Sequence, residues 1–154
     1  MNFEAPIKYE AQNPEFKKLI EDKLSRQHFM HHNGFELTKI LPGYAEASAP
    51  LKQHLLQQDG LVHGGVTATI ADLVTGFAAF SLVKKDDRVV TSDLKVSYFS
   101  PGRGDTVFAR GWVIKAGSRL HYCESEIYVI KDGEYSLIAK GYSIMAVIEG
   151  KNKQ

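Results

Sequence analysis

Several features are scarce or missing in this sequence of 154 residues, and each absence excludes a class of protein. A single cysteine, Cys123, excludes an internal disulfide and suits a reducing compartment, so we expect a cytoplasmic protein. The formal net charge of +1 provides no field that would attract nucleic acid or an anionic membrane. The first residues lack a basic stretch followed by an apolar one, so no secretory signal is expected. No cysteine and no His-Glu-x-x-His frame accompanies His28, His31 and His32, so we expect no metal site.

One long apolar run is present, at residues 61–83, and its length would suit a membrane span. Asp72 lies in the middle of this run, and a charge at the centre of a span disfavours insertion by about 3 kcal/mol. Glycines within the run also suggest loop or packing positions rather than a lipid-facing helix. We therefore expect a buried helix in a protein without a membrane partner.

The order of secondary-structure signals predicts an α+β protein with an antiparallel sheet. Residues 1–34 are expected to form an extension with one helix, which starts at the Asn13-Pro14 pair and runs to about His28. Residues 35–148 then form one domain around a helix over about 65–84. Alternation and turn signals predict a helical turn at 52–58 and strands at 35–41, 44–51, 90–98, 105–115, 119–130 and 134–148. A helix that is apolar on nearly all sides needs a curved sheet or a second subunit to cover it.

Asp72 is the only formally charged residue between Gly60 and Lys84. Burying a carboxylate among apolar neighbours is costly unless the group is paired or hydrogen-bonded. Carboxylates in such surroundings often serve at reactive sites. The sequence therefore makes Asp72 the first candidate for a catalytic group.

His63-Gly64-Gly65 falls where a loop becomes the long helix. The first N–H groups of a helix lack intrahelical partners and, with the helix dipole, favour the oxyanion of an attacked carbonyl. Alternatively, the glycines pack against a strand and His63 hydrogen-bonds a carbonyl. Eight residues of helix rise by about 12 Å, so one small carbonyl cannot contact both Gly64 and Asp72 of the same helix. If both serve one reaction, Asp72 comes from a second, antiparallel copy, as in a two-fold dimer.

Residues 63–72 and 90–101 together resemble the hot-dog-fold acyl-CoA thioesterases. The first segment joins His-Gly-Gly to an aspartate, and the second is a strand that ends in Ser100-Pro101. The resemblance covers about residues 35–148 and is nearest to the phenylacetic-acid-pathway branch of the 4-hydroxybenzoyl-CoA thioesterase superfamily. It implies a hot-dog fold, a curved antiparallel sheet wrapped around one long helix, in a homodimer or homotetramer. It also implies a hydrolase that splits acyl-CoA into acid and CoA, with CoA as part of the substrate and no cofactor.

By position, the resemblance implies that Asp72 supplies the base or nucleophile, while Gly64 of the other subunit donates its N–H to the thioester carbonyl. His63 would shape the oxyanion loop, Gln57 would hold the carbonyl or the water, and Thr91 would position the water. From the residues alone, Gln57 could equally cap a short helix. Thr91 could equally lie on the polar face of its strand, where threonine is common.

CoA carries phosphates, so cations and free N–H groups should lie near its binding site. Gly65, Arg103, Ser118 and Arg119 are the candidate substrate-binding residues, because they lie on loops that the resemblance places near CoA. Loop arginines are also often simply solvated.

Two other functions stay open. One is a non-catalytic protein that binds acyl-CoA, although a binder has no use for an acid beside the acyl group. The other is a hot-dog hydratase or dehydratase, which uses a catalytic histidine in a local pattern that this sequence lacks. The acyl group itself is not specified, since Phe77, Phe80, Tyr98 and Phe99 could line its pocket or simply form the core.

Overall fold

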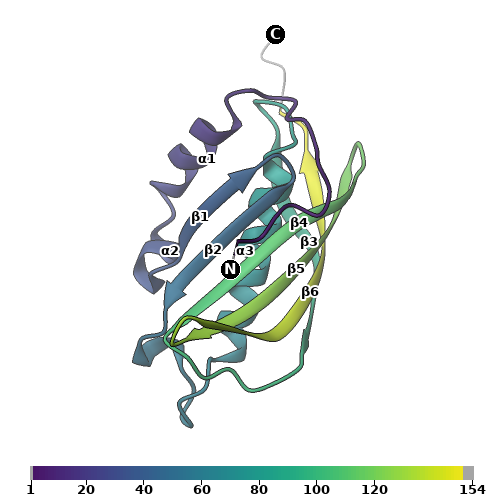
Figure 1. Ribbon diagram of the computed structural model, residues 1–154. Coiled ribbons are helices and arrows are strands. Elements are labelled where there is room, and N and C mark those ends of the chain that lie inside the picture. The colour runs from purple at the N-terminus through teal and green to yellow at the C-terminus, as the bar shows by residue number, and fades with distance from the viewer. Residues whose placement is uncertain (1, 151–154) are drawn as a thin grey trace.

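The structure is a computed structural model that describes residues 2–150. Its centre is a six-stranded, fully antiparallel sheet, as the sequence predicts, with the strand order β1-β2-β4-β5-β6-β3 (Figure 1). The strands are β1 (Glu36–Leu41), β2 (Tyr44–Pro50), β3 (Arg88–Tyr98), β4 (Thr106–Ala116), β5 (Leu120–Lys131) and β6 (Glu134–Ile148). β3 is thus an edge strand, although it lies in the middle of the sequence.

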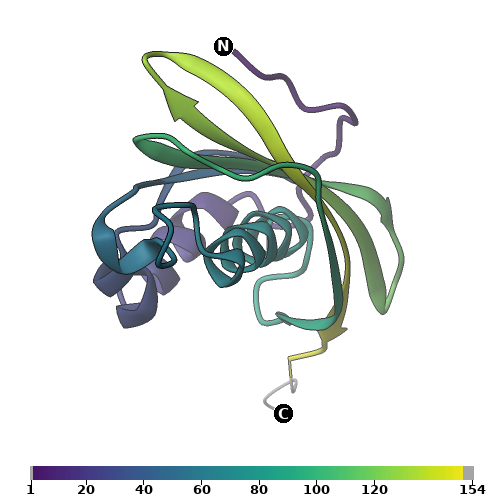
Figure 2. The same cartoon turned by 90° about the horizontal axis from the view of Figure 1, so that it is seen from below.

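Helix α3 (Gly64–Phe80) lies in the hollow of this curved sheet (Figure 2). It packs most closely at Gly111 of β4, where a side chain would clash with the backbone of Val74 and Thr75. The helix ends four residues before the expected Lys84, because Ser81 stops it. The Ser81 hydroxyl donates to the carbonyl of Ala78 at 2.7 Å and accepts the N–H of the β1–β2 turn at 2.7 Å.

No helix within residues 2–150 combines the length and the apolar character that a membrane crossing requires. The expected helical turn at 52–58 is the shorter 3-10 helix η1 (Gln53–Leu55). The loop that follows it leads directly into the start of α3.

The N-terminal extension contains two short helices, α1 (Phe16–Leu24) and α2 (His28–Asn33), so the prediction of one continuous helix to His28 is wrong. Asn13 does cap a turn, since its side chain accepts the N–H of Glu15 at 3.1 Å. Helix α1 starts only after this turn, at Phe16. The Ser25 hydroxyl donates to a carbonyl of the last turn of α1 at 2.8 Å. Serine side chains that bond backbone carbonyls compete with helix continuation.

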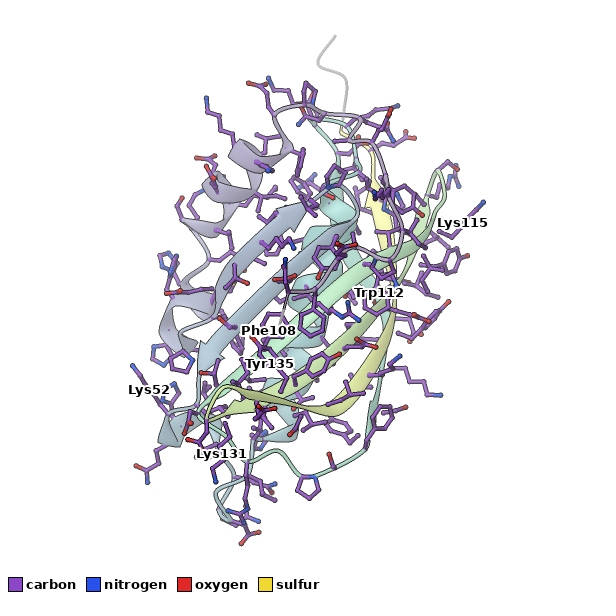
Figure 3. All side chains as sticks on the ribbon, viewed as in Figure 1. Lys52, Phe108, Trp112, Lys115, Lys131 and Tyr135 are labelled. Atoms are coloured by element: carbon purple, nitrogen blue, oxygen red, sulfur yellow. The ribbon has the colours of Figure 1, made fainter. Side chains whose placement is uncertain are left out.

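Residues 2–10 cross the outer face of the sheet, opposite α3 (Figures 1 and 3). Their exposure alternates, and Phe3 turns inward to stack on Phe108 with the ring centroids 5.5 Å apart. Lys39 donates to the carbonyl of Phe3 at 2.8 Å, and Tyr9 donates to the carbonyl of Ile114 at 3.0 Å. The outer face is therefore partly covered by the protein's own chain.

A β-bulge in β3 decides which way Thr91 points. Thr91 pairs with Met145 and Asp93 pairs with Ile144, so Ser92 is an extra residue in β3. Directly opposed residues share one face of a sheet, and Met145 is fully buried on the α3 side. Thr91 therefore faces α3, which corrects the alternative that it lies on the polar face of the strand.

Candidate active site

The start of α3 presents a free backbone donor. His63 has extended backbone angles (φ −63°, ψ 135°) and acts as the N-cap, with its Nδ1 accepting the N–H of Gly65 at 2.9 Å. Within residues 2–150, the N–H of Gly64 has no hydrogen-bond acceptor. Since His63 already occupies the N–H of Gly65, Gly64 is the residue whose N–H can meet a ligand.

Gly64 and Gln57 line one cavity of about 350 Å³, together with Tyr98 and Phe99. The Tyr98 hydroxyl donates to the carbonyl of Gly64 at 2.8 Å and so fixes the first turn of α3 to β3. Gln57 is half-buried and follows η1, whose C-cap is Leu56, so Gln57 does not cap that helix. Its side chain thus borders the same cavity as Gly64.

Asp72 and Thr91 line a second cavity, of about 460 Å³. The Thr91 hydroxyl donates to one carboxylate oxygen of Asp72 at 2.6 Å. Asp72 is only half-buried and Thr91 is exposed in the single chain, so the expected burial of Asp72 is incomplete. A carboxylate held through one oxygen leaves the other free to accept a proton or to attack a carbon.

The two halves do not meet in one chain. Gly64 and Gln57 belong to one cavity, whereas Asp72 and Thr91 belong to another. Both lie on α3 or beside it, about 12 Å apart along the helix axis. His63 and Gly65 border a third, smaller hollow of about 330 Å³.

The residues expected to bind CoA are also separated. Arg103 is exposed next to the loop before α3, and its guanidinium lies 3.6 Å from where a Cβ on Gly60 would be. Ser118 and Arg119 are exposed in the β4–β5 turn. That turn adjoins the other end of α3, about 25 Å away along the helix, because His121 contacts Ala79 there.

The sequence did not predict the hydrogen bond of the Tyr98 hydroxyl or the walls of the Asp72 cavity. The sequence marks Tyr98 only as an apolar or aromatic position, and nothing in it indicates a bond to Gly64. Part of the Asp72 cavity is formed by Gln27, Phe29 and Met30 of the N-terminal extension. That contact joins segments more than forty residues apart, and no local signal could have revealed it.

The remaining candidates for chemistry lie elsewhere. Cys123 is fully buried, and burial raises the pKa of its thiol to about 12. His28, His31 and His32 are exposed. Within residues 2–150, no group of three His, Cys, Asp or Glu side chains is arranged to hold a metal ion.

A family model described as the thioesterase superfamily matches residues 59–136, about half of the chain. The matched stretch contains Gly64, Asp72 and Thr91. The chain belongs to the thioesterase superfamily. A solved thioesterase-family protein from Silicibacter pomeroyi is 31% identical, covers 88% of this chain and 99% of its own length, and has a TM-score of 0.85. The activity that this membership indicates is thioester hydrolysis.

Two more distant structures share the fold of this thioesterase-superfamily protein. A thioesterase from Haemophilus influenzae is 21% identical over 96% of each chain, with a TM-score of 0.77. The PaaI protein from the phenylacetic acid degradation operon of E. coli is 18% identical, covering 88% of this chain and 95% of its own, with a TM-score of 0.78. At such identities the likeness shows the fold alone, and it confirms the predicted hot-dog architecture.

Proposed function

We propose that this thioesterase-superfamily protein hydrolyses acyl-CoA thioesters to a free acid and CoA, in the cytoplasm and as a homodimer at least. The observation that carries the proposal is the division of the site. One half, Gly64 with Gln57, and the other half, Asp72 with Thr91, line different cavities of one chain. An antiparallel second copy of α3 would place Gly64 of one protomer beside Asp72 of its partner.

The edge strand supports such a dimer. β3 pairs only with β6 in this chain, which leaves its other edge without a strand partner in residues 2–150. Val90 and Tyr98 on this strand are 50% and 55% exposed. Exposed apolar edges are usually covered by another chain. The homodimer is therefore the smallest assembly that fits, and a homotetramer is the larger form that the resemblance implies.

In the proposed reaction, the thioester carbonyl oxygen accepts the N–H of Gly64, where the helix dipole stabilises the developing negative charge. His63 holds this turn through Gly65, and Gln57 contacts the carbonyl or the water. Asp72 of the partner takes a proton from a water molecule, which attacks the carbonyl carbon. The C–S bond then breaks, and the CoA thiolate leaves and is protonated.

Direct attack by the Asp72 carboxylate on the carbonyl carbon is the second route. The C–S bond breaks, the CoA thiolate leaves and is protonated, and water then hydrolyses the acyl anhydride that has formed. The hydrogen bond from Thr91 serves both routes, because it fixes the direction of the free carboxylate oxygen. Aspartate reaches less far than glutamate, which favours activation of water.

The CoA moiety would lie toward loops from both protomers. Arg103 borders the loop before α3, and the Ser118-Arg119 turn adjoins the far end of the helix. In an antiparallel pair, the turn of one protomer comes toward Arg103 of the other. These cations would then face the phosphates from two sides.

The test mixes two inactive variants. Asp72→Asn removes the base, and Gly64→Pro removes the N–H at the first helical position, where proline fits the helix. The extended angles of His63 also suit a residue that precedes proline. Each variant alone should lose at least about 100-fold in kcat for acyl-CoA hydrolysis, as expected for a missing base or oxyanion donor.

Random mixing should give one heterodimer for every two dimers, each with one intact site, and so about a quarter of wild-type activity. Gly64→Ala is the control, because it keeps the N–H and its Cβ would lie 3.6 Å from the Tyr98 hydroxyl, an ordinary contact. Near wild-type turnover by Asp72→Asn would remove Asp72 from the mechanism. Absence of recovery, with heterodimers demonstrated by native mass spectrometry, would exclude a shared site.

A further inference from the structure

The cavity at Asp72 continues along α3, away from the Gly64 end. Asp72, Gly76 and Phe80 follow one another at four-residue spacing, so they lie on the same side of the helix. All three line the cavity, and so do Leu73 and Phe77 between them. The cavity is therefore a groove whose floor is the second half of α3.

Gly76 keeps this groove open. A Cβ at Gly76 would meet no atom within 4 Å, in contrast to Gly111, where it would clash with the backbone of α3. Glycine is unfavourable in the interior of a helix, so its presence here needs a reason other than close packing. The reason that fits the geometry is room for a ligand.

The N-terminal extension forms the opposite wall of the groove. Gln27 of the α1–α2 connection contributes to it, and so do Phe29 and Met30 of α2. Phe29 is 61% exposed, so its ring projects beside the groove rather than into the core. The wall on the β3 side includes Val89 and Met145.

Charges lie only at the two ends of this groove. Asp72 marks the end toward the reaction, whereas Lys23 and Arg88 mark the other. The Lys23 ammonium lies over the Phe80 ring, 4.8 Å from its centroid. The stretch between these ends carries no charge and is mostly apolar, with Gln27 on one wall, which suits a hydrocarbon and not a second phosphate or a sugar.

We propose that the acyl group lies in this groove, from Asp72 toward Phe80 and beneath α2, and that Gly76 and Phe29 determine which acyl chains fit. The inference rests on the proposed acyl-CoA function and specifies its substrate class, an apolar acyl group of medium length. From Asp72 to Phe80 the helix rises by about 12 Å, which is the reach of such a chain.

The first test measures binding without catalysis. Alkyl-CoA thioethers lack the carbonyl and cannot be hydrolysed, so titration calorimetry can compare ethyl-CoA with octyl-CoA. In the wild type, affinity should increase by up to about fourfold for each buried methylene. Gly76→Leu should lower the octyl-to-ethyl affinity ratio about tenfold or more, whereas Gly76→Ala, with its single methyl group, should lower it less than about threefold.

The second test measures kcat/KM for acyl-CoAs of the same lengths. Phe29→Ala removes an exposed ring beside the groove and should lower the ratio of kcat/KM for octanoyl-CoA to that for acetyl-CoA about threefold to tenfold. Leu137→Ala is the control, since Leu137 is an exposed apolar residue on the outer face of the sheet and should leave the ratio unchanged.

An unchanged length dependence in Gly76→Leu overturns the inference. The inference also fails if Gly76→Leu loses affinity equally for all chain lengths and elutes as a monomer in size-exclusion chromatography. That result would mean that the partner's helix fills the groove in the wild-type dimer. If the wild type binds the thioethers in the expected length-dependent way but hydrolyses no acyl-CoA, the groove assignment stands and the proposed hydrolysis fails.

Discussion

The two faces of the sheet hold their carboxylates in opposite ways. On the outer face, Glu126 accepts hydrogen bonds from Arg110 at 2.7 Å, from Tyr128 at 2.7 Å and from Lys140 at 3.0 Å. On the inner side, Asp72 accepts one hydrogen bond, from Thr91. The outer carboxylate is saturated with donors, whereas the inner one keeps a free oxygen.

The Glu126 network shifts the pKa values of its own members. Burial would raise the pKa of Glu126, but the hydrogen bonds from Tyr128, Lys140 and Arg110 outweigh it and lower that pKa. Burial, with the Glu126 carboxylate, raises the pKa of Tyr128 to about 12. Perturbed carboxylates are often taken as marks of active sites, yet ion-pair networks produce them as well. Here the network binds three strands together, whereas the carboxylate proposed for catalysis is the one that keeps a free oxygen.

The largest effect on stability is expected from Glu126→Gln. The substitution leaves the mostly buried Arg110 without its charge partner and should lower the free energy of unfolding by about 2–3 kcal/mol. Urea denaturation measures this, and kcat should stay at the wild-type value. Glu124→Gln is the matched control on the same strand and face, with an expected change below about 0.5 kcal/mol. A loss of kcat without loss of stability would reverse the contrast between the faces.

Acid should erase the difference between wild type and Glu126→Gln. Because the pKa of Glu126 is lowered in the folded protein, its contribution is present above the unfolded value of 4.5 and is lost as the pH falls through the folded value. Urea denaturation between pH 7 and pH 3 should show the two curves converging below pH 4.5. If the difference in the free energy of unfolding between the two proteins stays constant or widens as the pH falls, the pKa of Glu126 is not lowered by folding.

Thr91→Val should act on catalysis instead. It removes the donor to Asp72 while nearly keeping the shape, and we expect kcat to fall about tenfold, the worth of one hydrogen bond to a charged group. Thr91→Ser keeps the hydroxyl and should retain most of the activity. The free energy of unfolding should change little in either variant, since Thr91 is exposed. Equal activities of the valine and serine variants would show that the bond is incidental.

Phe3→Ala should have the smallest effect, about 1 kcal/mol in the free energy of unfolding, from a half-buried ring that stacks on Arg110. Glu4→Ala, at the exposed neighbouring position, is the control and should be neutral. Activity should be unchanged in both. A fall in kcat for Phe3→Ala alone would connect the outer face to the site and break the separation between the two faces.

Local signals in the sequence were enough to predict most of the fold. Period-two alternation and pairs such as Asp132-Gly133 placed the strands within about two residues. The long helix followed from its apolar run, although its end did not, because Ser81 stops it through a contact with the distant β1–β2 turn. The split of the N-terminal helix depends on Ser25, whose side chain competes with a regular backbone bond.

The site was predictable only in part. Spacing alone showed that Gly64 and Asp72 cannot meet on one helix, and their separate cavities agree with that argument. The orientation of Thr91 was not predictable, because the bulge at Ser92 exists only relative to β6. The incomplete burial of Asp72 was missed as well, since it depends on what lies beside α3 rather than on its neighbours in sequence.

The bulge ties the proposed chemistry of this protein to the pairing register of one edge strand. Thr91 faces α3 because it pairs with Met145 and leaves Ser92 as the extra residue. A slip of β3 by one residue would place Ser92 opposite Met145 and turn Thr91 to the outside. No side chain would be lost, and every strand would still be present. The donor that meets Asp72 is thus chosen by strand register, which a comparison of side chains alone would overlook.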